Sequence, residues 1–389
     1  MRGRAAAVLG VFGSFISAGC GDDTGTGGAG GEAASGTVKV QISGEELATE
    51  GFSFPTGSEV TIADGWAISF DHVFVTVGRA WLSDNPDLNP SDASQTGAEV
   101  AEAVGPWAVD LARPGDVPGA GGEGTAHSLA LIDSETLNGG GPLAADRRYA
   151  FSFSFVPASA AASPVGFGDD PDALAAYDEA VAGGYAVYYV GTATFVGGSC
   201  EVSDETYDFA AIPTTVRFRL GFDTPVHYTN CQNQENDGEP FADEEYQRGL
   251  SIRSDGPSLA QITVHVEHPF YSDVQHEPGL FFDQLAALLV GAPEGTELTM
   301  EHLEGLDPTG FEDGAGENLP WRVCDGSPLP AATGRAFEVG TIPTGPGQDP
   351  AEGFRDYRDY VRYVQSTQGH MNGGEGLCYI CLLYTSRCV

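Results

Sequence analysis

The sequence of 389 residues contains 54 glycines and 24 prolines, and 41% of its residues are hydrophobic. This apolar content is enough for a sizeable core, so disorder over the whole length is excluded. The 56 acidic residues far outnumber the 17 basic ones, which gives a formal net charge of −39. Phosphate backbones would repel such a chain, so we expect no nucleic-acid partner. The sequence also lacks a P-loop, a dinucleotide-binding glycine fingerprint, a nucleophile elbow and paired CxxC motifs.

Residues 1–19 have the features of a signal peptide. Arg2 and Arg4 provide a positively charged start, residues 5–18 form an apolar stretch, and small residues precede Cys20. The apolar stretch is too short to span a bilayer comfortably, and no other apolar run of the sequence approaches the roughly 20 residues needed. The sequence therefore predicts that the chain is exported.

The tripeptide Ala-Gly-Cys at 18–20 resembles the end of the lipobox of bacterial lipoproteins. It departs from that pattern at Ser17, where the family prefers leucine or another aliphatic residue. The resemblance implies that Cys20 is lipidated, becomes the mature N-terminus and anchors the chain in a membrane. Residues 21–36 are polar and rich in glycine, which is typical of a flexible tether. The residues just after Cys20 favour the outer membrane of the cell envelope, and an ordinary secretory signal with an incidental cysteine is the alternative.

The C-terminal residues 381–389 begin with CLLYTS, a hexapeptide that resembles one translated frame of a sequencing-library adapter. We therefore expect residues 381–389 to be an artefactual tail, wholly or in part. The alternative is a genuine tail with a coincidental match.

The cysteine count predicts two disulfides. Of seven cysteines, the lipid-anchor cysteine and the two in the tail leave four, an even number suited to an oxidising compartment. These four are Cys200, Cys231, Cys324 and Cys378. They allow three pairings, and we expect the sequential one, Cys200 with Cys231 and Cys324 with Cys378.

From residue 37 onward the sequence is typical of β-structure. Runs rich in Phe, Tyr and Val are separated by Gly, Pro and Asp turns. Strands are expected at 37–43, 66–77, 149–156, 185–196, 214–222, 259–268 and 337–342. This pattern predicts a mainly β or all-β fold, a large β-sandwich or barrel-like domain over residues 37–380, with two closely packed β modules as the alternative.

Helical patterns are few and short. They occur at 172–181, 280–290 and 351–366, so we expect two or three short helices. Long loops rich in glycine, proline and acidic residues are expected at 84–105, 113–125 and 305–319.

Residues 264–283 hold the best candidate metal site. His265, His268 and His276 lie there with Asp273, at a strand end that runs into a loop. Imidazoles combined with carboxylates suit zinc, copper or iron. Strict alternation along a strand places His265 and His268 on opposite faces, so a shared ion requires a twist or bulge there. A polar rim of the β domain and a catalytic histidine are the alternatives.

A second, weaker candidate is residues 233–244, which resemble the calcium loop of an EF-hand. Asn233, Glu235, Asp237 and Glu244 occupy positions one, three, five and twelve, and a glycine stands at position six. Asn at position one, Glu at position three, proline at position eight and missing flanking helices depart from the family. The resemblance therefore implies calcium binding by the loop alone and not the EF-hand fold. The alternative is an acidic surface loop without an ion.

Taken together, these features favour a lipid-anchored binding protein of the cell envelope whose specific form is metal binding. Catalytic residues are not assigned, and an enzyme is the less favoured class. The alternatives are a metal-dependent hydrolase that uses the same histidines and an adhesion or carbohydrate-binding module with calcium-ordered loops. A protein or glycan partner is compatible with either binding role.

Overall fold

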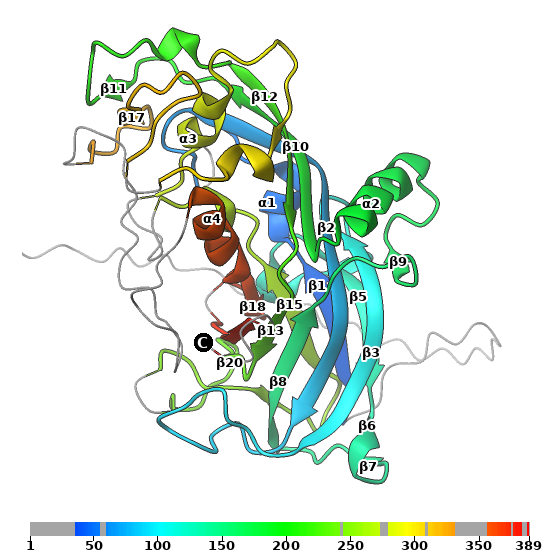
Figure 1. Cartoon of the computed structure of the whole chain (residues 1–389). Coiled ribbons are helices and arrows are strands. Elements are labelled where there is room, and N and C mark those ends of the chain that lie inside the picture. Colours follow the sequence, from blue (N-terminus) through cyan, green and yellow to red (C-terminus); the bar gives the residue numbers. More distant parts are fainter. Residues whose placement is uncertain are drawn as a thin grey trace, which may run out of the picture. The chain divides into compact units, whose positions relative to one another are not determined.

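The computed structural model describes residues 36–54, 60–241, 244–272, 279–307, 310–330, 356–374, 376–382 and 387–388. The described part of the chain is mainly β, with four short α-helices and long loops, as the sequence predicted (Figure 1). Its two main sheets are those of a β-sandwich, and the described strands do not close into a barrel.

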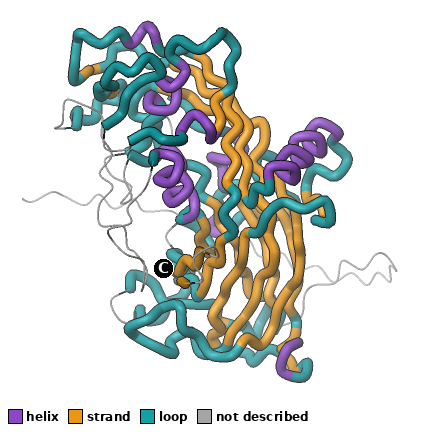
Figure 2. Tube along the Cα trace, in the orientation of Figure 1, coloured by secondary structure: helices purple, strands orange, loops and turns teal. Residues whose placement is uncertain are grey.

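The larger sheet contains most of the long strands. Its members are β2 (Trp66–Ser83), β3 (Glu99–Asp110), β8 (Arg148–Phe155), β9 (Ser163–Val165), β10 (Val187–Phe195), β12 (Thr215–Phe222), β13 (Val226–Thr229), β14 (Leu250–Ser251), β16 (Leu298–Thr299), β19 (Tyr379–Leu382) and β20 (Arg387–Cys388). The strand order is β16-β12-β10-β2-β8-β13-β19-β20, with β3 paired to β2, β9 to β3 and β14 to β8. Figure 2 shows these strands side by side.

The smaller sheet has five strands and carries the candidate site at one edge. It comprises β1 (Val38–Ser43), β4 (Val117–Pro118), β5 (Thr125–Ile132), β15 (Ser258–Val264) and β18 (Gly369–Met371), in the order β18-β15-β1-β5-β4. β1 pairs parallel to β15 and antiparallel to β5, and β18 is antiparallel to β15. Two small pairs complete the strands, β6 (Ser134–Glu135) with β7 (Gly141–Pro142) and β11 (Glu201–Val202) with β17 (Arg322–Val323).

The helices are short. The α-helices are α1 (Glu45–Glu50), α2 (Pro171–Gly183), α3 (Asp283–Ala286) and α4 (Tyr357–Ser366). The 3-10 turns are η1 (Ala120–Gly122), η2 (Thr136–Asn138), η3 (Phe209–Ala211), η4 (His268–Phe270), η5 (Ala287–Leu289) and η6 (Met300–Leu303). None of the helices in the described part of the chain is both long and apolar enough to pass through a membrane.

The two main sheets share one hydrophobic core. Val40 and Ile262 of the smaller sheet belong to the same buried cluster as Val75, Phe153 and Tyr228 of the larger sheet. Alternation along each strand sends these side chains inward, and their burial provides the main favourable free energy of folding. The smaller sheet is therefore fixed to the larger one through its apolar face.

Helix α2 packs on the larger sheet through a second, separate cluster. Tyr177 of α2 contacts Phe74 of β2 edge-to-face, with ring centroids 5.5 Å apart. The carboxylate of Asp170 accepts hydrogen bonds from the amides of Asp172 and Ala173, which caps the helix N-terminus. Gly184 in a left-handed conformation ends the helix. The helix predicted at 172–181 is thus confirmed.

The expected strands are confirmed at β1, β2, β8, β10 and β12. The strand expected at 259–268 is confirmed as β15 only up to Val264, because η4 begins at His268. The strand expected at 337–342 lies outside the described residues. The loop expected at 84–105 is partly wrong, because it contains the first half of β3. β3 is rich in Ala and Glu and carries Pro106 in its middle, features that disfavour a strand prediction. The proline is accommodated where the register between β2 and β3 shifts, between Val77 and Arg79.

The four cysteines of the predicted set form two disulfides, but the sequential pairing expected from the sequence is wrong. The bridges are Cys200–Cys324 and Cys231–Cys378. Antiparallel pairing of β11 with β17 sets Glu201 opposite Val323, so Cys200 and Cys324 meet at the next register position. Loop length alone could not predict this, because the pairing follows from long-range strand contacts. Two structural disulfides indicate an oxidising environment.

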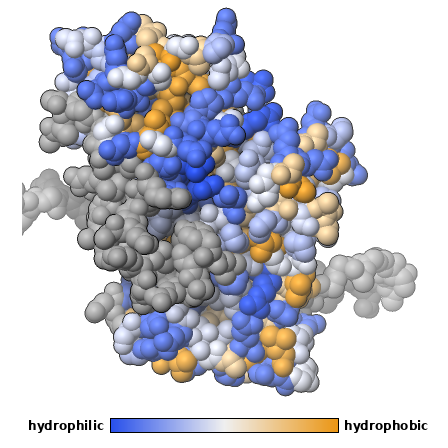
Figure 3. Space-filling view, viewed as in Figure 1, coloured by the Kyte–Doolittle hydropathy of each residue, from blue (hydrophilic) through white to orange (hydrophobic). Residues whose placement is uncertain are grey.

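Several large hydrophobic side chains are exposed in the described part of the chain. Figure 3 shows hydrophobic residues in separate patches among hydrophilic ones on the side that is drawn. The large hydrophobic side chains that are exposed come from distant parts of the chain: Leu88, Val104, Leu131, Leu137, Leu174, Val196 and Leu377. Single exposed hydrophobic residues of this kind are normal for a folded protein.

Candidate metal centre

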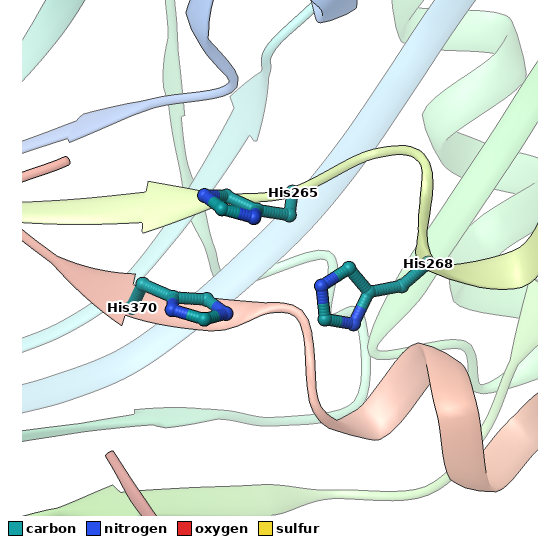
Figure 4. A group of neighbouring side chains, drawn as sticks. All are labelled: His265, His268 and His370. Atoms are coloured by element: carbon teal, nitrogen blue, oxygen red, sulfur yellow. The ribbon is translucent and has the colours of Figure 1, made fainter. Parts of the chain in front are cut away.

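Three histidines converge at the edge of the smaller sheet. His265 directly follows β15, His268 begins η4, and His370 lies in β18. One ring nitrogen from each lies within 4.8 Å of the other two (Figure 4). His268 and His370 are only 1% and 4% exposed. In the described part of the chain this is the one such group of three His, Cys, Asp or Glu side chains.

Strand pairing explains why His370 lies beside His265. β18 runs antiparallel to β15 with His370 opposite Thr263, and the amide of His265 continues the pairing by donating to the Gln368 carbonyl at 2.9 Å. Alternation places Thr263 and His265 on the same face of the sheet, so His265 and His370 are diagonal neighbours.

His268 reaches the same place because β15 ends first. The strand finishes at Val264, and η4 begins at His268 with Pro269 in its first turn. A continued strand would have sent His268 to the opposite face, whereas this turn brings its ring toward His265. The twist that the sequence required for a shared site is therefore present.

The three rings differ in orientation. His265 and His370 are stacked, with centroids 4.2 Å apart and planes 11° apart, while His268 meets both edge-on (Figure 4). A histidine lone pair lies in the ring plane, so two parallel rings do not aim at one point. Joint coordination of an ion requires one of these rings to rotate about its Cβ–Cγ bond.

Hydrogen bonds leave one nitrogen of His268 suited to metal binding. The Thr367 hydroxyl donates to the Val364 carbonyl at 2.7 Å, so its oxygen accepts from His268 Nδ1 at 2.7 Å. A neutral imidazole that donates through Nδ1 carries its lone pair on Nε2. The end of α4 thus fixes both the tautomer and the orientation of His268, which is the usual role of an outer partner of a metal ligand.

Glu267 plays the same part for His265. Its Oε1 lies 3.2 Å from His265 Nδ1, which leaves Nε2 as the lone-pair atom. This Nε2 is buried and has no hydrogen-bond partner among the described residues. Burial opposes protonation of His265, but Glu267, Glu45 and Glu123 together raise its pKa.

Three acidic side chains, those of Glu45, Glu123 and Glu267, cluster beside His265. Burial raises the pKa of Glu45 well above its usual range, and Glu123 and Glu267 add to the rise while His265 opposes it. Glu45 Oε2 lies 4.0 Å from His265 Nε2. A bound cation would offset this concentration of acidic groups.

The structure tests only part of the predicted metal set. His265 and His268 come together as proposed, while Asp273 and His276 lie outside the described residues. Sequence reasoning missed His370. Its only sequence signal is a histidine placed just after the helical pattern at 351–366, and nothing local connects it to residues 264–283.

The predicted calcium loop has its side chains engaged elsewhere. Both carboxylate oxygens of Glu244 accept from Arg248 Nε, at 2.6 and 2.7 Å, and Asn233 Oδ1 accepts from the Glu235 amide at 3.0 Å. Glu235 and Asp237 are exposed, and residues 242–243 lie outside the described residues. The described geometry therefore offers this loop no support as a calcium site.

Comparisons with protein-family models, with curated proteins and with solved structures found no match for the chain.

Proposed function

We propose that this chain binds a divalent transition-metal ion through the imidazoles of His265, His268 and His370. The observation that carries the proposal is their convergence from three separate elements, with one ring nitrogen of each within 4.8 Å of the others. Zinc and copper are the ions best suited to such a set, because both bind neutral imidazole well. The net charge of −39 favours cations around the chain in general.

Outer partners support the proposal further. Thr367 and Glu267 each hold one histidine by Nδ1, which fixes the orientation of the rings of His268 and His265. His268 and His370 are buried, which would shield a bound ion from bulk water.

The test is the melting temperature of the purified chain with Zn²⁺, with Cu²⁺ and with a chelator. An ion bound only to the folded chain stabilises it by about 2.7 kcal/mol at a free concentration a hundred times the dissociation constant. We expect a metal-dependent rise for the wild type, its loss in His370→Ala, and its retention in the control His227→Ala. His227 lies in β13 against Trp81, outside the cluster. A wild-type melt that is the same with either metal and with chelator would exclude the site.

We propose in addition that the chain is exported and anchored in the outer membrane through lipid on Cys20. The lipobox-like residues 18–20 and the glycine-rich stretch after them support this, and the two disulfides suit an exported chain. Growth with a clickable fatty acid is expected to label the wild type and not Cys20→Ser. Absence of label from the wild type, or label that survives the substitution, would end the lipid-anchor proposal.

A further inference from the structure

We propose that the carboxylate of Glu45 is the fourth ligand of this ion, which makes the site a closed set of three imidazoles and one carboxylate. The inference rests on the proposed metal binding and deepens it. It specifies the four ligands of the ion. The number of protein ligands in turn distinguishes a structural metal site from a catalytic one.

The first support is the position of the Glu45 side chain. Its Oε2 lies 4.0 Å from His265 Nε2, the nitrogen that carries the lone pair. The side chains are only 16% and 13% exposed. His265 Nε2 is buried and has no hydrogen-bond partner among the described residues, whereas the Glu45 carboxyl also contacts the carboxyl group of Glu123. An unpartnered nitrogen in a protein interior is costly unless something binds it, and the Glu45 carboxylate lies on its side of the ring.

The second support is the backbone of Glu45. Five non-glycine residues of the described chain have positive φ, and four of them are Asn85, Asp146, Asn230 and Asn372, types that tolerate this conformation. Glu45, at φ 58°, is the exception. Its amide donates to Ser43 Oγ at 2.9 Å, which holds the strained residue at the start of α1. Strain of this kind is typical of positions where a side chain must reach a functional site.

Glu267 is nearer to His265 than Glu45 is, but it serves a different role. Its Oε1 contacts Nδ1, on the side of the ring away from the lone-pair nitrogen. Glu267 is therefore a positioning residue, and Glu45 is the carboxylate that faces Nε2.

A closed set of this composition has two consequences. Imidazole and carboxylate suit divalent zinc, whereas monovalent copper prefers thiolate and thioether ligands. Catalytic zinc sites usually combine three protein ligands with a water, and structural sites have four protein ligands. Glu45 in the fourth position leaves no place for a metal-activated water, so the site holds its ion and does not use it for hydrolysis.

The experiment is titration of the purified chain with Zn²⁺ and with Co²⁺, whose visible spectrum reports coordination number. Glu45→Gln keeps the size of the side chain and removes its charge. We expect it to weaken Zn²⁺ binding on the order of a hundredfold or more, beyond the tenfold to hundredfold effect of losing an outer partner. The Co²⁺ bands should weaken as water enters the coordination sphere. Glu46→Gln, on the exposed neighbour in the same helix, is the matched control and should change neither quantity.

Glu45→Gly separates ligation from folding. Glycine adopts positive φ freely, so this variant should melt without metal at least as high as the wild type while losing Zn²⁺ affinity like Glu45→Gln. Unchanged Zn²⁺ affinity and Co²⁺ spectra in both Glu45 variants would overturn the fourth ligand and leave three-histidine binding standing. Failure of the wild type to bind either ion would overturn both proposals.

Discussion

Replacing Cys231 and Cys378 together by serine is expected to lower the free energy of unfolding by about 5 kcal/mol. The bridge links residues 147 apart in sequence, and its loss restores the freedom of that long loop in the unfolded chain. Cys231 is also fully buried in the main core. Urea unfolding followed by circular dichroism measures the effect.

The same change should weaken metal binding. His370 and Leu377 form an antiparallel bridge, and the amide of Gln232 donates to the Leu377 carbonyl at 2.8 Å, so the disulfide ties the strand of His370 to the end of β13. The matched control is Cys200→Ser with Cys324→Ser, which removes a loop of similar length between β11 and β17. We expect a comparable loss of stability there with Zn²⁺ affinity retained by the folded chain. Equal affinities in the two double variants would show that the bridge does not position His370.

Arg322→Met is expected to lower the free energy of unfolding by about 3–5 kcal/mol. Arg322 pairs with Asp283 through two nitrogens, one of them Nε at 2.9 Å, and the Trp66 indole donates to the same carboxylate at 2.8 Å. Asp283 and Arg322 are 0% and 6% exposed, so the variant removes the cation that compensates a buried negative charge. Urea unfolding again provides the measurement.

Two controls make this result specific. Arg253→Met breaks an exposed pair with Asp255, whose side chains are 62% and 74% exposed, and should cost less than about 1 kcal/mol. Asp283→Asn combined with Arg322→Met removes both charges and should recover part of the loss. The losses of unfolding free energy in Asp283→Asn alone and in Arg322→Met alone are added for comparison. If the double variant loses as much as this sum, packing and not charge pairing dominates at this position.

Local patterns in the sequence were sufficient for the strands with strong β-propensity and for α2. They failed at β3, where alanine, glutamate and a proline form a strand only because β2 and β9 pair with it. His265 and His268 were found because they are neighbours in sequence. His370 could not be found in this way, because the pairing of β18 with β15 brings it to the site. Glu45 could not be found either, because its backbone has an unusual conformation that the sequence does not predict.

On the proposal made above, the route of the chain also sets when the ion can be taken up. A polypeptide that leaves the ribosome or crosses a membrane with its N-terminus first exposes His265 and His268 well before His370. Until residues 356–371 have docked, only two imidazoles are in place and the partner that orients His268 is missing. Firm retention of the ion therefore requires this segment, and a chain in which it has not yet docked would hold the ion only weakly.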